Sequence, residues 1–323
     1  MDADASPLGL PDYPFRRSLH DRLGNRRSDP DFLQRCWADP SSRALVVRGT
    51  DLAVTDSRTA LAWTFPGDAP DGERLLLGES DGVVHVAVLM PDDDRSQVEF
   101  DDIQVSVGTG TTAEHVSFAP LRVLAQQLDD LDASYAVHAT ALAMWHRRHL
   151  RCSVCGEPTT AAVGGESRHC GDCGANHFPR TDPAVIMSVV DETGRILLGH
   201  NIARKDGWYS TLAGFVEPGE TPEDAVVREV FEEVGVRVDR ATYLGSQPWP
   251  FPSSLMLGYE ACARAAEVEV DGVEITSARW FTRDELRGAV ESGAVGLPTT
   301  ISIAGALITR WYGHELPANV LQV

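Results

Sequence analysis

The sequence predicts an α/β protein with more than one domain, and three observations carry this prediction. Short apolar runs separated by Gly, Asp and Pro fill residues 41–106, as in a mainly β domain. Paired cysteines follow near residue 150, and beyond them apolar strand patterns alternate with an amphipathic helix. At 323 residues the chain also exceeds the usual size of one domain. We expect an N-terminal domain at 1–147, a cysteine-rich segment at 148–180 and a second α/β domain at 181–323.

Composition limits the classes of function. The net charge of −20 and a pI of 4.8 argue against non-specific binding of nucleic acid by charge, although a polyphosphate could bind through a metal ion. The first twenty residues lack the basic start and apolar run of a signal peptide. The most apolar stretch, 294–308, is interrupted by Pro298 and three hydroxyl residues, so no membrane span is expected. These features predict a cytoplasmic protein.

In the first domain, the stretch after the predicted strands of 41–106 is interrupted less often by Gly, Asp and Pro. Residues 113–151 are predicted to be helical, in two pieces separated near Pro120. No chemical motif precedes residue 150.

The cysteine cluster reads RCSVCGEPTTAAVGGESRHCGDCGANHF, with two CxxC pairs fourteen residues apart. Each pair precedes a Gly, so each can form a knuckle that directs two thiolates at one ion, which predicts a structural zinc bound by Cys152, Cys155, Cys170 and Cys173. Two disulfides are disfavoured by a reducing compartment, and a redox CxxC is disfavoured because the motif is doubled. Cys36 and Cys262 lack such partners and are expected to be buried or incidental thiols.

The second α/β domain begins with AVIMSVV and RILLGH, both predicted strands, followed by a helix that ends near Val236. Thr221 is the expected N-cap and Gly235 the expected stop. At 100° per residue, an apolar stripe is predicted from Val227, Val230, Phe231 and Val234. The same spacing places Glu229, Glu232 and Glu233 on the opposite face.

Three carboxylates on one helical face repel one another. They form either a solvated acidic surface or a site for a hard divalent cation such as Mg²⁺ or Mn²⁺. The surroundings favour the cation, because Gly214 and Gly219 allow tight turns before the helix and Glu220 can pair with Arg228.

These residues complete the pattern G-x5-E-x7-R-E-U-x-E-E-x-G-U, where U is aliphatic, from Gly214 to Val236. The pattern resembles the signature of the Nudix hydrolases, which cleave nucleoside diphosphates linked to another moiety. The resemblance implies an α/β/α sandwich in which Glu229, Glu232 and Glu233 bind two or three Mg²⁺ or Mn²⁺ ions. It also implies that the backbone carbonyl of Ala213 completes one coordination sphere.

Ten residues after this signature lies SQPWPFPSS, with prolines at alternate positions around Trp249 and Phe251. Proline is excluded from helix interiors and central strands, so we predict a stiff loop. Its aromatic rings either plug the core or line a ligand pocket. Together with a preceding zinc ribbon, the motif is similar to that of the NADH pyrophosphatase group of Nudix hydrolases, over residues 150–310.

That resemblance implies a set of substrate-binding residues: Phe178, Phe215, Gln247, Pro248, Trp249, Pro250, Phe251, Pro252, Ser253, Ser254 and, more loosely, Ser302. It makes Glu274 a further metal ligand, although a surface Glu is the alternative. With stacking worth about 1–3 kcal/mol per base, aromatic rings suit nicotinamide and adenine, so we now favour the pocket wall for SQPWPFPSS.

The predicted function is therefore metal-dependent hydrolysis of the diphosphate of NADH or NAD⁺, giving NMNH or NMN and AMP, with Glu232 or Glu233 as base. NAD-capped RNA carries the same diphosphate and is a possible substrate by resemblance. The alternatives are a Nudix hydrolase of ADP-ribose or a dinucleoside polyphosphate, and a non-catalytic nucleotide- or RNA-binding module. The resemblance also implies a homodimer.

Overall fold

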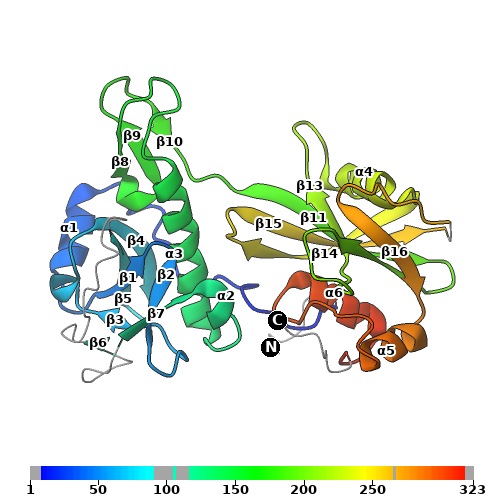
Figure 1. Cartoon of the computed structure of the whole chain (residues 1–323). Helices are drawn as coiled ribbons and strands as arrows, with labels where there is room; N and C mark the ends of the chain where they lie inside the picture. The colour runs from blue at the N-terminus through cyan, green and yellow to red at the C-terminus, as the bar shows by residue number, and fades with distance from the viewer. Residues whose placement is uncertain (1–8, 91–104, 107–115, 265–266, 317–323) are drawn as a thin grey trace. The chain divides into compact units, whose positions relative to one another are not determined.

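The computed structural model describes residues 9–90, 105–106, 116–264 and 267–316 (Figure 1). The chain divides into two compact units, which we describe separately. Unit 1 comprises 1–16, 182–249 and 254–323, and unit 2 comprises 17–181 and 250–253. This division groups the cysteine-rich segment with the strands and helix before it. The three predicted domains stay a prediction.

Unit 1 is built on a six-stranded sheet of order β14-β15-β11-β12-β16, with β13 paired to β11. β11 and β15 are parallel, and the other pairs are antiparallel. The predicted strands AVIMSVV and RILLGH are confirmed as β11 and β12. The strand bounds are Asp182–Asp191 (β11), Ile196–Asn201 (β12), Leu212–Phe215 (β13), Val238–Trp249 (β14), Ser254–Ala263 (β15) and Ile275–Phe281 (β16).

Helices cover both faces of this sheet (Figure 1). α4 (Pro222–Val234) packs Val226, Val230 and Val234 against one face, where Val185 and Met187 of β11 meet them. α6 (Ile303–Tyr312) covers the other face around Ile186, while α5 (Arg283–Glu291) packs against Ile196 and Leu198. Successive β11 side chains thus enter opposite cores, as the period of two requires. The predicted α/β/α sandwich is confirmed.

The segment SQPWPFPSS is only partly the predicted loop. β14 continues through Trp249, and Pro248 lies opposite Leu255 of β15. Pro248 is tolerated because β14 is an edge strand, whose outward N–H positions need no ladder partner. The turn itself is confined to residues 250–253.

Unit 2 contains a seven-stranded sheet of order β4-β5-β1-β2-β7, with β3 on β1 and β6 on β3, and a separate sheet of order β10-β9-β8. The bounds are Arg43–Arg48 (β1), Asp51–Thr55 (β2), Trp63–Thr64 (β3), Glu73–Ser80 (β4), Val83–Met90 (β5), Val105–Ser106 (β6), Val116–Pro120 (β7), Thr159–Ala162 (β8), Ser167–Cys170 (β9) and Asn176–His177 (β10). The helices are Pro30–Ala38 (α1), Leu121–Leu124 (α2) and Asp130–Arg148 (α3), with short 3-10 turns at Pro66–Asp68 and Val163–Gly165.

The expectation of helix throughout 113–151 is wrong at its start. Residues 116–120 form β7, which pairs antiparallel with β2, and the long helix begins only at Asp130. The stretch VSFAP carries β-branched and aromatic residues that suit a strand, and its partner lies more than sixty residues earlier in sequence, at 51–55. Residues 113–115 lie outside the described part.

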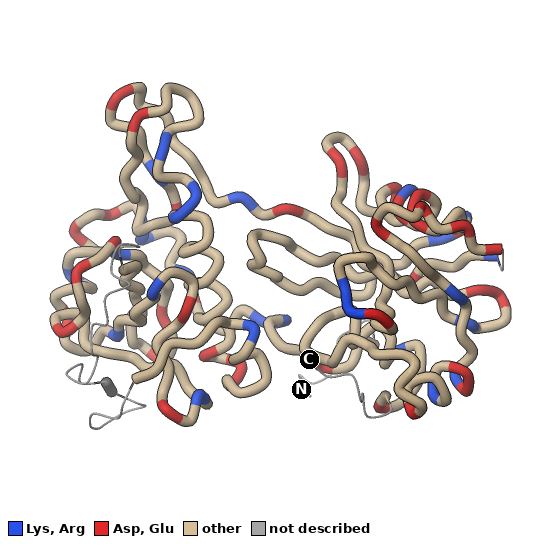
Figure 2. The backbone as a smooth tube through the Cα atoms, in the orientation of Figure 1, with Lys and Arg blue, Asp and Glu red and all other residues tan. Residues whose placement is uncertain are grey.

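In neither unit do the described helices combine the length and the apolar character needed to cross a lipid bilayer. Figure 2 shows Asp and Glu spread over both units and interspersed with Lys and Arg, so acidic residues are not confined to one segment of the described chain.

Candidate active site

The helix that carries the three glutamates is fixed at both ends by its own sequence. The Thr221 hydroxyl accepts the Asp224 N–H at 3.2 Å, and Pro222 occupies the first turn. Gly235 ends the helix with a φ of 70°, a conformation in which a Cβ is costly. Both predicted caps are confirmed, so the register of the carboxylates is set locally.

The apolar stripe of α4 differs from the prediction. Val230 and Val234 are buried, but Val227 and Phe231 are 42% and 46% exposed. The buried stripe runs instead through Val226, Val230 and Val234, at i, i+4 and i+8. This rotation turns Glu233 toward the sheet rather than into solvent.

Glu229 lies against the strand that precedes the helix. A Cβ built on Gly214 would fall 1.9 Å from its carboxyl carbon, so only Gly permits this approach. The Glu229 side chain is 15% exposed, and burial raises the pKa of its carboxyl group. Ala213, whose carbonyl is the other predicted ligand, is the preceding residue of β13 and lies opposite Ile186.

Glu233 is the most constrained of the three carboxylates. The residue is 6% exposed, and its Oε2 atom is buried with no hydrogen-bond partner. Burial, helped by the charges of Glu229 and Glu274, raises the pKa of Glu233 to about 8. A buried carboxylate oxygen without a partner is costly unless a cation meets it.

Arg228 organises the remaining acidic groups. Its guanidinium donates to both carboxylate oxygens of Glu220 at 2.8 Å, which confirms the predicted pair and lowers the pKa of Glu220 to about 2. The same guanidinium donates to Glu229 at 2.9 Å, to Glu232 at 3.0 Å and to the Phe215 carbonyl at 2.9 Å. The Glu232 side chain is 58% exposed. Arg228 therefore joins the loop before the helix to the carboxylate face.

Glu274 comes from a different element, just before β16. Its negative charge contributes to the raised pKa values of both Glu229 and Glu233. Its backbone N–H donates to the Asp271 carboxylate at 3.1 Å, and its carbonyl accepts the Ile202 N–H at 2.9 Å. Asp271 was not among the predicted site residues, although the Asp-Gly pair at 271–272 is a recognisable turn signal.

The donor set suits a hard divalent cation. Carboxylate oxygens are the ligands such ions prefer, and the carboxylates of Glu229 and Glu233 are both held in partly or fully buried positions. The partnerless Oε2 of Glu233 is the clearest sign of a fit, because within the described residues no protein group neutralises it.

The predicted substrate residues have diverse environments. Phe215 and Phe178, in unit 1 and unit 2 respectively, are 58% and 70% exposed, so both rings are accessible. Ser302 caps α6, where its hydroxyl accepts the Gly305 N–H at 3.4 Å. Pro250 is buried, and six residues are half-buried: Pro248, Trp249, Phe251, Pro252, Ser253 and Ser254. Their contacts with substrate stay predictions.

Gln247 differs from its neighbours because it is fully buried. Its amide nitrogen donates to the carbonyls of Pro14 and Ile301, at 2.8 and 2.9 Å, and its oxygen accepts the Ile303 N–H at 2.8 Å. Three of the four hydrogen-bonding positions of the side-chain amide are therefore occupied by backbone groups of unit 1. The predicted contact of Gln247 with a dinucleotide stays a prediction, and this geometry does not favour it.

The four cysteines converge as predicted. All are free thiols, and their sulfur atoms lie within 4.8 Å of one another. Two matching turns hold them, since the Gly156 N–H donates to the Cys152 carbonyl and the Gly174 N–H to that of Cys170. Both glycines have positive φ, at 82° and 76°. Four sulfurs at this separation fit tetrahedral Zn²⁺ and leave no ligand position for water.

His177 is a neighbour of this cluster that the sequence did not single out. Its Nε2 lies 3.2 Å from the Cys152 sulfur, and its Nδ1 lies 3.5 Å from the Ser153 hydroxyl. With the proton on Nε2, the ring donates to the thiolate, a common way to orient a metal ligand. Only its position four residues after Cys173 could have indicated it.

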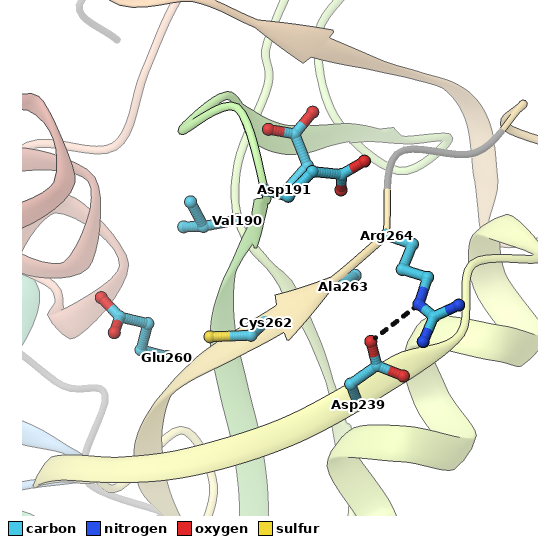
Figure 3. A pocket seen from close by; sticks show the side chains of 8 residues that line it. Val190, Asp191, Asp239, Glu260, Cys262, Ala263 and Arg264 are labelled. Carbon is cyan, nitrogen blue, oxygen red and sulfur yellow. Dashed lines mark hydrogen bonds and ion pairs between the residues drawn. The ribbon is translucent and has the colours of Figure 1, made fainter.

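A cavity of about 530 Å³ lies elsewhere in unit 1 (Figure 3). It is lined by Val190, Asp191, Glu192, Asp239, Glu260, Cys262, Ala263 and Arg264. Several of its charges are already paired: Arg264 lies 3.4 Å from Asp239, Arg195 lies 2.7 Å from Asp191, and Arg310 contacts Glu260. The cavity contains none of the predicted site residues.

Three family models match the chain. A NUDIX domain matches residues 180–298, an NADH pyrophosphatase zinc ribbon domain matches 147–178, and an NADH pyrophosphatase-like rudimentary NUDIX domain matches 37–145. Together they place related domains in both units.

Individual proteins are also similar. The NAD-capped RNA hydrolase NudC of Mycobacterium bovis is 36% identical over 311 residues, covering 91% of this chain and 93% of that protein. The human NAD-capped RNA hydrolase NUDT12 is 42% identical over 197 residues, covering 57% of this chain but only 43% of its own length. The crystal structure of a NUDIX hydrolase from Nitrosomonas europaea also aligns with this chain, at 22% sequence identity and a TM-score of 0.39. The alignment covers 52% of this chain and 95% of that protein.

Proposed function

The chain belongs to the NADH pyrophosphatase group of the Nudix hydrolase family, and from this premise we propose that it hydrolyses the diphosphate bond of NADH or NAD⁺. The products are AMP and NMNH or NMN. One observation carries the proposal: Glu233, whose buried carboxylate oxygen has no hydrogen-bond partner, lies one turn after Glu229 on a helix whose register is fixed by its caps.

We assign the carboxylates to two roles, binding metal ions and accepting a proton. We assign Glu229, Glu233 and Glu274, with Glu232 and the Ala213 carbonyl, as ligands of two or three Mg²⁺ or Mn²⁺ ions. Such ions supply activation of water and neutralisation of the diphosphate charge. Glu232 or Glu233 accepts the proton of the attacking water, and Arg228 keeps Glu229 and Glu232 in place. Gly214 leaves the space that the Glu229 carboxylate occupies.

Substrate selection is assigned to the aromatic groups. The exposed Phe215 ring follows Gly214 directly and is available for stacking on a heterocycle. Trp249 stands at the end of the edge strand β14, so its backbone is held by pairing with Ser254. A preorganised wall of this kind reduces the entropy lost on binding.

NAD-capped RNA is a second proposed substrate. It presents the same diphosphate, and relatives named NAD-capped RNA hydrolases align with 91% of the chain in one case and 57% in another. The net charge of −20 implies that any RNA contact beyond the cap is weak. A cytoplasmic homodimer containing one structural zinc per chain completes the proposal.

The test is a side-by-side assay of NADH, NAD⁺, ADP-ribose and NAD-capped RNA with Mg²⁺ and then Mn²⁺. We expect AMP release from NADH and NAD⁺, and a 5′-monophosphate RNA from the capped transcript. Much faster turnover of ADP-ribose than of NADH would assign the enzyme to another Nudix specificity. No metal-dependent turnover of any of them would favour a binding module.

A further inference from the structure

A short N-terminal segment, residues 10–15, forms part of the core of unit 1; we call it the N-terminal strap. Leu10 and Tyr13 are buried at 3% and 5% exposure, in a cluster with Leu244 of β14 and Ile303 of α6. The strap therefore contributes apolar packing to the same layer that α6 forms on the sheet. Its loss would leave this face of β14 uncovered.

The strap contacts β14 at Gly245 and Ser246, where SQPWPFPSS begins. The Tyr13 hydroxyl donates to the Ser246 carbonyl at 3.1 Å. A Cβ on Gly245 would come within 3.0 Å of that hydroxyl oxygen and 3.2 Å of Leu10, so a small residue is needed there. The pairing register of β14 with β15 also shifts between Tyr243 and Gly245. The strap thus contacts β14 where the strand is irregular.

Gln247 joins three segments that are far apart in sequence. It donates to the Pro14 carbonyl of the strap and to the Ile301 carbonyl, and it accepts the N–H of Ile303. Ile303 is the first residue of α6, so this bond satisfies an amide that lacks a partner within the helix. Removing the amide would leave two partly buried carbonyls and one buried N–H to find other partners.

The strap backbone adds a sign of constraint. Phe15, directly after Pro14, is buried at 5% exposure and has a φ of 67°. A bulky residue in this region is strained and persists only where its surroundings hold it. The bond from Gln247 to Pro14 is one such restraint.

We propose that Gln247 is a positioning residue, which uses the N-terminal strap and the start of α6 to fix the strand that presents Pro248 and Trp249. It acts through the wall of the pocket rather than by touching substrate. This inference rests on the proposed function, because it assigns Trp249 to the dinucleotide site. It also gives residues 10–15 a role in substrate binding although they lie more than 200 positions before the motif.

The test compares Gln247→Met with Val290→Ala in the full-length protein. Methionine keeps the volume of Gln247 but makes none of its three hydrogen bonds, whereas Val290 is a fully buried residue of the α5 core. We expect Gln247→Met to raise KM for NADH about tenfold with kcat within about threefold, because loss of preorganisation weakens binding. Both variants should lower Tm by similar amounts, but Val290→Ala should leave KM for NADH unchanged. Tyr13→Phe should shift KM in the same direction by less.

Hydrogen exchange supplies a readout without activity. In Gln247→Met, amides of residues 10–16 and 246–249 should exchange faster, whereas in Val290→Ala they should not. Unchanged exchange and unchanged KM in Gln247→Met would overturn the inference, as would equal KM changes in both variants. If the wild-type enzyme released no AMP from NADH, the proposed function would fail, and the exchange experiment would still decide whether Gln247 anchors the strap.

Discussion

Gly214 and Glu229 are in such close contact that a Cβ on the glycine would lie 1.9 Å from the carboxyl carbon of the glutamate. The strand and the helix that carry the proposed metal ligands therefore meet at a point where no side chain fits. The position of the Glu229 carboxylate depends both on the lack of a side chain at Gly214 and on the hydrogen bond that it accepts from Arg228.

The first prediction follows from this contact. Gly214→Ala should displace the Glu229 carboxylate and lower kcat/KM for NADH on the order of 100-fold, since misplacement by an ångström can cost that much. Steady-state kinetics and Mg²⁺ titration provide the measurement. Gly288→Ala is the matched control, because a Cβ there meets no atom within 4 Å and helix α5 accepts Ala readily. Equal activity of both variants would refute the packing argument.

The second prediction concerns the carboxylate that lacks a partner. Glu233→Gln keeps the shape of the side chain but removes the charge that attracts a cation, so kcat should fall on the order of 100-fold or more. Circular dichroism and zinc content should match the wild type, because α4 keeps its caps and the cysteines lie in unit 2. A rate near that of the wild type would remove Glu233 from the metal site.

The third prediction separates an exposed ring that binds from one that does not. Phe215→Ala should raise KM for NADH about tenfold with little change in kcat, because a stacked base is worth about 1–3 kcal/mol. Phe231→Ala is the control, since that ring is also exposed, at 46%, but lies on the outer side of α4. The experiment is a kinetic comparison at saturating metal. Parallel KM changes in the two variants would contradict a specific role for Phe215.

The fourth prediction tests the zinc site by its stability. Cys155→Ser should abolish the single bound zinc and lower the Tm of unit 2 by about 5 °C or more, because a structural metal contributes directly to folding. Cys155 is exposed, so the substitution removes little packing. Metal analysis and scanning calorimetry provide the readouts. Cys262→Ser, which changes a thiol outside the cluster, should retain one zinc per chain.

Local signals predicted much of helix α4. Thr221, Pro222 and Gly235 set its ends within one short stretch, and the paired Glu220 and Arg228 lie eight residues apart. The cysteine knuckles are equally local, since each closes within four residues. Such features depend on neighbouring residues, which is why the sequence reveals them without knowledge of the fold.

Contacts over long distances in sequence were not predicted. The strand β7 forms only because β2 pairs with it, and the strap meets Ser246 across 233 positions. The buried apolar stripe of α4 was predicted wrongly because Val226 and Val227 are equally apolar, and only packing against the sheet determines which of them is buried. Gln247 looked like a ligand for the same reason, since a polar side chain in a motif does not reveal what it bonds.

The last prediction concerns acid. Three histidines of unit 2 are buried together: the His20 ring bonds Ser134 at 2.7 Å and His138 at 3.2 Å, and His85 bonds Tyr135 at 2.9 Å. Burial lowers the pKa of His20 to about 3 and of His85 to about 4, and it lowers the pKa of His138 although Glu166 opposes the shift. All three are therefore neutral in the folded protein at neutral pH.

The sign follows from the unfolded state, where histidine has a pKa of 6.5. Unfolding takes up protons below that pH, so the stability from these neutral rings is complete above 6.5 and is lost as pH falls toward the folded values. Tm should decline from about pH 7 to about pH 5, and less steeply in His20→Gln, which takes up one proton fewer on unfolding. His169→Gln, at a histidine that is only half-buried, should leave the slope closer to that of the wild type. Parallel Tm profiles for wild type and His20→Gln would show that His20 is already protonated in the fold, against the burial argument.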